Sequence, residues 1–172
     1  MQTPMNSLWF RLMALEYRTK TRAVLPILED AGIRAGMSVL DFGCGPGRYA
    51  LPAAKLVGVG GAVYAVDVHP LAIAMIERKA KRDRLGNLQT IQTDCPTGLP
   101  TGSVDVVLLY DALHDVEDRS AVLTELHRVL KEDGRLRYRD HTFFGDQLVS
   151  LMKSRGFCAA DETAQQITFK KC

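Results

Sequence analysis

The residues most suited to binding a ligand form one short stretch, Asp41-Phe42-Gly43-Cys44-Gly45-Pro46-Gly47. An apolar run precedes the acid and a helix-forming stretch begins near Arg48, which is typical of a strand, a tight loop and a helix start. Glycine permits positive φ and close approach to the main chain, and the free N–H groups of the next helix point toward whatever binds there. The stretch therefore predicts a nucleotide-type binding turn.

The spacing of the glycines separates the candidate ligands. A dinucleotide fingerprint needs G-x-G-x-x-G, but Arg48 stands where the third glycine would be. A phosphate loop would end in Gly-Lys-Ser or Gly-Lys-Thr, and the segment lacks that ending. The pattern therefore disfavours an NAD-linked oxidoreductase and a phosphate loop of that type.

A second acid, Asp67, ends the apolar run 62–66, about 20 residues beyond the last glycine of the loop. In a βαβ unit this separation brings a carboxylate level with a ribose. The carboxylate can then accept hydrogen bonds from both ribose hydroxyl groups. The alternative is that Asp67 caps the helix that begins at Pro70, although His69 could cap that helix as easily.

The loop resembles the first motif of the class I S-adenosylmethionine-dependent methyltransferases, an apolar strand followed by an acid and alternating glycines, matched here by Asp41, Gly43, Gly45 and Gly47. The segment 126–136 resembles the helix end that precedes the fifth strand of that family. Within the superfamily, the pattern is similar to quinone-biosynthesis C-methyltransferases and arsenite methyltransferases. The resemblance implies methyl transfer from S-adenosylmethionine to a small molecule, with S-adenosylhomocysteine as product.

The resemblance also implies roles for residues at the ends of neighbouring strands. Asp67, with Val68 beside it, would hold the ribose, and Asp94 with the backbone N–H of Cys95 would bind the adenine. Tyr110, at the end of the fourth strand, completes the expected cofactor-binding set.

His114, just after the fourth strand, is the candidate catalytic residue. A sulfonium methyl is already activated, so displacement needs chiefly an aligned nucleophile, and a base is needed only for an oxygen or acidic carbon nucleophile. By residue type His114 suits that role, with His141 in reserve. The alternative is a loop histidine held by Asp111 or Asp115.

The elements that position these residues alternate between strand and helix. Apolar runs and helical periodicity predict strands at 38–41, 62–67, 87–94, 103–110, 135–139, 157–160 and 166–170, and helices ending near 57 and spanning 70–82, 118–131 and 146–155. We expect an α/β, Rossmann-like, doubly wound and mostly parallel seven-stranded sheet with a C-terminal antiparallel hairpin. Residues 36–172 form the methyltransferase domain, and residues 1–35 form helices whose Trp9, Phe10 and Tyr17 suggest a lid.

Composition bounds the function classes. The chain has 172 residues, 47% of them apolar, and a formal net charge of +2, which indicates one ordinary globular domain and gives no reason to expect nucleic acid. No apolar run approaches a membrane span, and no targeting segment is evident. The four cysteines lack a C-x-x-C pair, so we expect neither a metal site nor a disulfide framework. Because unpaired cysteines suit a reducing compartment, we expect a cytoplasmic location.

Two features depart from the family pattern. Arg135, Arg137 and Arg139 alternate along a strand that is usually apolar, which predicts thin cover, contact with a second copy in a homo-oligomer, or contact with an acidic ligand. No segment is long enough to be a separate substrate domain. Both features leave open an alternative function, a non-catalytic methyltransferase-like subunit of a larger enzyme.

Overall fold

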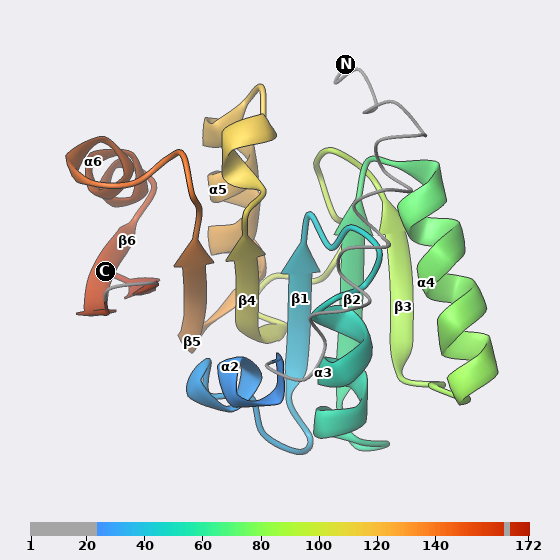
Figure 1. Ribbon diagram of the computed structural model, residues 1–172. Helices are drawn as coiled ribbons and strands as arrows, with labels where there is room; N and C mark the ends of the chain where they lie inside the picture. The colour runs from blue at the N-terminus through green and yellow to red at the C-terminus, as the bar shows by residue number, and fades with distance from the viewer. Residues whose placement is uncertain (1–23, 164–165) are drawn as a thin grey trace.

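A single seven-stranded sheet organises the computed structural model, which describes residues 24–163 and 166–172 (Figure 1). The strand order is β3-β2-β1-β4-β5-β7-β6. The first five strands run parallel, whereas β7 pairs antiparallel with both β5 and β6. The expected fold class, including the closing hairpin, is confirmed. The aromatic residues of the predicted lid lie outside the described residues.

The element bounds agree closely with the periodicity of the sequence. The strands are β1 (Ser38–Phe42), β2 (Ala62–Asp67), β3 (Leu88–Gln92), β4 (Val104–Tyr110), β5 (Leu130–Arg139), β6 (Phe157–Glu162) and β7 (Ile167–Lys171). The helices are α2 (Val24–Asp30), α3 (Ala50–Val57), α4 (Pro70–Asp83), the short 3₁₀ helix η2 (Leu113–Asp115), α5 (Arg119–Val129) and α6 (Asp146–Ser154).

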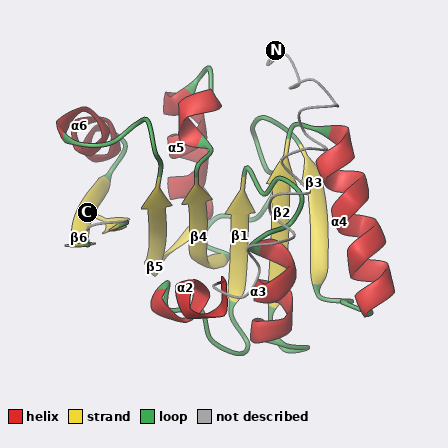
Figure 2. Ribbon diagram, viewed as in Figure 1, coloured by secondary structure: helices red, strands yellow, loops and turns green. Residues whose placement is uncertain are grey.

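Two apolar cores cover the two faces of the sheet. One contains buried side chains of α2, α3 and α4, and the other contains those of α5 and α6. Figure 2 shows α2 and α3 in front of the strands, with α5 behind them. Because helices cover both faces, the central strands are apolar along most of their length, as β4 illustrates with five consecutive buried residues from Val106 to Tyr110. Because β1 to β5 run parallel, their carboxyl ends share one edge of the sheet, where loops carry the polar residues.

The predicted helix 118–131 is two residues too long at its carboxyl end. Asp118 caps α5 by accepting the N–H of Ala121 at 2.9 Å, but the helix ends at Val129 and Leu130 is already extended. Leu130 is fully buried and pairs with Val104 at the start of β4, so sheet pairing overrides the helical periodicity there.

The strand of alternating arginines also differs from the expectation. Arg137 is 5% exposed, and its guanidinium lies 2.6 Å from Asp30 Oδ2 at the end of α2 and donates to Thr168 Oγ1 at 2.6 Å. A buried guanidinium needs such partners because its desolvation is costly. At Arg137 the cover is therefore complete, and the charge is compensated within the chain.

Of the two flanking arginines, Arg139 has polar partners within the chain, whereas Arg135 has only a packing contact. Arg139 pairs with Asp111 at 3.2 Å and donates to the hydroxyl of Tyr49. Arg135 packs over Gly32, where an added Cβ would lie 2.7 Å from its Nη1 atom. The expectation of thin cover is therefore wrong for Arg137, and Arg137 and Arg139 have acidic partners without a second copy of the chain. For Arg135, and for the protein as a whole, an oligomer contact stays a prediction.

The expectation that the cysteines form no disulfide is wrong for two of them. Cys158 of β6 and Cys172 at the carboxyl end are joined by a disulfide, and their Cα atoms are 5.2 Å apart. The β6–β7 pairing places these two residues near each other, a proximity that the sequence spacing did not reveal. Cys44 and Cys95 keep free thiols.

Among the described residues, no helix is both long enough and apolar enough to cross a membrane.

Candidate functional site

The glycine loop joins β1 to α3 at the carboxyl edge of the sheet. The backbone N–H groups of Gly43 and Cys44 both donate to the carbonyl of Val66, at 2.8 and 2.9 Å, which ties the loop to β2. A Cβ added to Gly43 would lie 2.4 Å from the Cβ of Ala112, so this position has no room for a side chain. At Gly45, with φ of 50°, an added Cβ would meet no described atom within 4 Å. Among the described residues, nothing therefore covers Gly45 in the direction of its missing side chain, which leaves room for a ligand there.

Asp67 lies at the end of β2, directly against this loop. Its Oδ2 accepts the N–H of Gly45 and its Oδ1 accepts the N–H of His69, both at 2.8 Å. Burial raises the pKa of Asp67, although these backbone donors oppose the rise. The residue that caps α4 is His69, whose Nδ1 accepts the N–H of Leu71 at 3.1 Å. The alternative that Asp67 is the helix cap is therefore wrong.

Asp41 supplies a second carboxylate behind the loop. It is 1% exposed, and its Oδ2 has no hydrogen-bond partner among the described residues. Burial raises the pKa of Asp41 to about 7, and the nearby charge of Asp67 adds to the rise. A buried acceptor without a donor is costly, so this oxygen suits a hydroxyl or ammonium group of a ligand. The acceptors beside this loop, the carboxylates of Asp41 and Asp67, suit a ligand that carries an amine and hydroxyl groups.

Asp94 and Cys95 lie beyond β3 on the same edge of the sheet. With the first turn of α5 and the residues before it, they line a cavity of about 240 Å³. Glu125 of α5 fixes the loop that follows Cys95. Its carboxylate accepts hydrogen bonds from the backbone N–H of Thr97 at 2.8 Å and from the Thr97 hydroxyl at 2.6 Å. Val68, expected to contact the ribose, is half-buried just after β2. The structure therefore brings the residues assigned to adenine together around a cavity.

Tyr110 ends β4, but its side chain points into the protein. The residue is 5% exposed, its ring lies 5.0 Å from that of Tyr49, and its hydroxyl donates to Gln166 Oε1 at 3.2 Å. Burial raises the pKa of Tyr110 to about 12, so the hydroxyl stays protonated. Binding of the cofactor by Tyr110 stays a prediction, and it would have to involve the backbone.

His114 lies on η2, just after β4, and its ring is hydrogen-bonded to Asp140, a partner that the sequence did not indicate. Its Nδ1 is 2.9 Å from Oδ2 of Asp140, which follows β5, and its Nε2 is 3.4 Å from Oδ2 of Asp115. Burial alone would raise the pKa of Asp140, but hydrogen bonds from Thr142 and His114 outweigh it and the pKa is lowered. The Asp140 side chain is fully buried and anionic, so it fixes the orientation of the imidazole.

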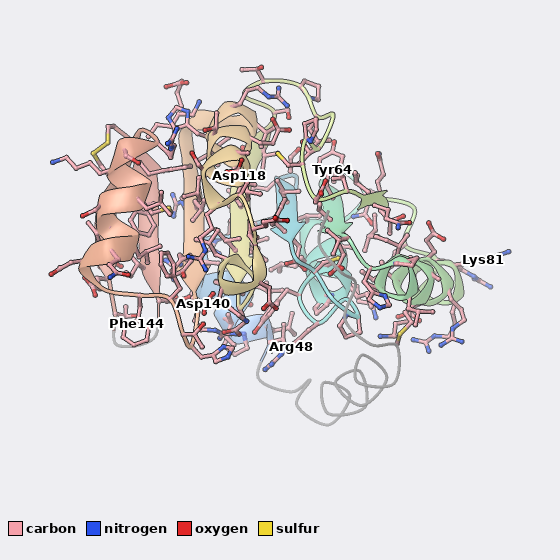
Figure 3. All side chains as sticks on the ribbon, turned by 90° about the horizontal axis from the view of Figure 1, so that it is seen from above. Arg48, Tyr64, Lys81, Asp118, Asp140 and Phe144 are labelled. Atoms are coloured by element: carbon pink, nitrogen blue, oxygen red, sulfur yellow. A yellow bond between two sulfur atoms is a disulfide. The ribbon has the colours of Figure 1, made fainter. Side chains whose placement is uncertain are left out.

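His141 forms a second histidine–carboxylate pair beside the first. Its Nδ1 is 3.3 Å from Asp111 Oδ1, and its ring meets that of His114 edge to face with centroids 4.7 Å apart. Figure 3 looks down on this edge of the sheet and shows Asp140 and Arg48 on one side of the strands and Asp118 on the other. The edge thus carries the glycine loop with Asp41, Asp67 and Asp94 at β1 to β3, and a histidine–aspartate cluster at β4 and β5.

Comparisons with known proteins agree with this layout. A family model described as a methyltransferase domain matches residues 40–138. The demethylmenaquinone methyltransferase of Geobacillus kaustophilus is 32% identical over 123 residues, 69% of this chain and 53% of that protein. The nocamycin O-methyltransferase of Saccharothrix syringae is 34% identical over 122 residues, 70% of this chain and 42% of that protein. This chain thus spans about half the length of the curated relatives it matches.

One solved structure is similar over nearly its whole length. The crystal structure of a SAM dependent methyltransferase from Aquifex aeolicus superposes with a TM-score of 0.84 at 21% identity, covering 96% of this chain and 98% of that chain. At this identity the likeness supports the fold alone.

Proposed function

Because the chain belongs to the methyltransferase domain family of the class I S-adenosylmethionine-dependent superfamily, we propose that it transfers a methyl group from S-adenosylmethionine to a small-molecule acceptor. One observation carries the proposal. One carboxylate oxygen of Asp67 accepts the N–H of Gly45, and the other accepts the N–H of His69 at the start of α4. The carboxylate therefore lies directly beside the space next to Gly45. Each of its oxygens keeps a lone pair for a ribose hydroxyl.

The cofactor would be held along the loops after β1, β2 and β3. Asp67 and Val68 would contact the ribose, Asp94 and the N–H of Cys95 the adenine, and the glycine loop with Asp41 the amino-acid end. The unpartnered oxygen of Asp41 supports the last assignment, because an ammonium group would satisfy it. When bound, the cofactor supplies a sulfonium methyl that is already activated.

The acceptor would lie toward β4 and β5, where we place His114 as the group that activates it. The acceptor's lone pair forms a bond to the methyl carbon as the carbon–sulfur bond breaks, the acceptor's proton passes to His114 Nε2 and from there to water, and S-adenosylhomocysteine leaves. A small-molecule acceptor is supported by the names of the two curated relatives, a demethylmenaquinone and a nocamycin methyltransferase.

Several assignments extend this proposal. Residues 36–172 would form the catalytic domain. Of the residues 1–35 expected to form a lid, α2 instead packs in the core of the domain, so the proposed lid over the ligand is confined to residues 1–23. We also propose a cytoplasmic location, where reduction would open the Cys158–Cys172 disulfide without touching the cofactor loops. The alternative of a non-catalytic subunit rested partly on the arginine strand, and two of those arginines have acidic partners inside the chain.

Calorimetry tests the proposal directly. The purified chain should bind S-adenosylmethionine and S-adenosylhomocysteine but not NAD, and it should release S-adenosylhomocysteine when supplied with metabolite pools. Binding of NAD alone would overturn the assignment. Binding of S-adenosylmethionine without turnover across the pools would favour the non-catalytic subunit.

A further inference from the structure

The two histidines at the ends of β4 and β5 are prepared in the same way. His114 Nδ1 faces Asp140 at 2.9 Å, and His141 Nδ1 faces Asp111 at 3.3 Å. An ionised carboxylate only accepts hydrogen bonds, so each Nδ1 carries a proton, and in the neutral form of each ring Nε2 then presents the lone pair. Metal-binding histidines have this arrangement, because a carboxylate on the second nitrogen fixes the ring and its tautomer.

The distances suit a single ion. The ligand atoms of His114, Asp140 and His141 lie within 4.8 Å of one another. An octahedral ion about 2.1 Å from two imidazole nitrogens, with roughly 90° between the two bonds, would set the ring centroids roughly 4.6 Å apart. The observed separation is 4.7 Å, with the ring planes at 74°.

The carboxylate that lies within 4.8 Å of both histidines is that of Asp140, but Asp115 is the better candidate for the third ligand. Asp140 already accepts hydrogen bonds from His114, Thr142 and Phe143, so its oxygens are occupied in orienting the site. Asp115 Oδ2 lies 3.4 Å from His114 Nε2, and its side chain is 74% exposed, so it can turn onto an ion at little cost.

We propose that His114 Nε2, His141 Nε2 and the Asp115 carboxylate bind one divalent first-row transition-metal ion, with Asp140 and Asp111 as positioning residues. Two imidazoles and one carboxylate occupy one face of such an ion and leave the other face open. The role of the ion rests on the proposed function, and it changes one step of it: with the ion bound to His114 Nε2, the acceptor's proton passes to water and His114 acts as a ligand of the ion. The open face takes the oxygen of a hydroxylated acceptor, such as a phenol or an enol, and favours loss of its proton. The substrate class is therefore an oxygen acceptor able to bind a metal.

Direct metal binding tests the proposal without any knowledge of the acceptor. The full chain, stripped with a chelator, is titrated with Co²⁺ followed by visible absorption and with Mn²⁺ followed by calorimetry. We expect one ion per chain. His141→Ala should weaken binding at least tenfold, and because this side chain is 66% exposed its removal leaves the fold intact. Asp140→Asn should weaken binding about 10- to 100-fold.

A matched control removes an imidazole elsewhere. His127 packs against Phe157 with ring centroids 5.2 Å apart, in α5 and away from the cluster, so His127→Gln should bind Co²⁺ and Mn²⁺ like the parent. No stoichiometric binding by the parent, or equal binding by the parent and His141→Ala, would overturn the site.

Each sample is also titrated with S-adenosylmethionine. A chain that binds that cofactor but no ion overturns the metal site alone, and one that binds the ion but no cofactor overturns the proposed function alone.

Discussion

Gly45 donates its backbone N–H to Oδ2 of Asp67 at 2.8 Å, a hydrogen bond between residues 22 positions apart in the chain. The bond fastens the glycine loop of β1 to the end of β2. The carboxylate that shapes the loop is therefore also the one proposed to receive the ribose. Loss of Asp67 would disturb both the ligand and the loop that faces it.

Asp41 should destabilise the protein in the absence of ligand. Burial raises its pKa to about 7, whereas the pKa of an aspartate in the unfolded chain is about 3.9. The folded state therefore holds the proton more tightly, and this contribution to stability falls as pH rises from about 4 to 7. Asp41→Asn should raise the free energy of unfolding at pH 8 by up to about 4 kcal/mol, and by little at pH 4.

Urea denaturation at the two pH values measures this effect. The same variant should bind S-adenosylmethionine more weakly than the parent, because it loses the anionic oxygen proposed to face the ammonium group. A stabilisation of equal size at pH 4 and pH 8 would contradict the assignment of the shift to Asp41.

Glu125 should have the opposite pH dependence. Its hydrogen bond with Arg128, assisted by those from Thr97, lowers its pKa to about 2. Its contribution to stability is complete above the unfolded pKa of about 4.3 and is lost as pH falls toward 2. Glu125→Gln should lower the free energy of unfolding at pH 7 by up to about 3 kcal/mol. In urea denaturation between pH 7 and pH 3, the gap to the parent should narrow as pH falls. A constant gap would count against this linkage.

The disulfide gives a prediction that requires no ligand. Thiol titration of the denatured chain should find two free thiols before reduction, from Cys44 and Cys95, and four after it. Reduction of a crosslink that spans 14 residues should lower the free energy of unfolding by about 3 kcal/mol. Four thiols without a reductant would show that Cys158 and Cys172 are not paired in the purified protein.

Much of the fold could be predicted because its signals are local. The run 62–67 and the helix that begins at Pro70 are bounded by glycine, proline and a strand-end acid, and the structure has both as expected. The errors arose where long-range pairing decides. Leu130 joins β5 because it pairs with Val104, and Arg137 is buried because Asp30 reaches it from α2.

The cofactor region could be predicted better than the acceptor region for a similar reason. Asp41, Gly45 and Asp67 have a fixed spacing within one βαβ unit, so their proximity follows from the sequence. The histidine cluster joins residues of two separate loops, and nothing in the local sequence shows that Asp140 would hold His114. An acid directly after a strand that neighbours β4 is the signal that could have indicated it.

The central claim is that Asp67 binds the cofactor, and calorimetry with S-adenosylmethionine tests it most directly. Loss of a charge-assisted hydrogen bond costs about 1.5–3 kcal/mol, so Asp67→Ala should weaken binding about 10- to 100-fold. Asp105→Ala is the matched control, because Asp105 also accepts a backbone N–H, that of Ser38 at 2.7 Å, but lies at the opposite end of the sheet. Circular dichroism checks that both variants fold. The account predicts weakened binding for Asp67→Ala and parental affinity for Asp105→Ala, and equal affinity for the parent and Asp67→Ala would contradict it.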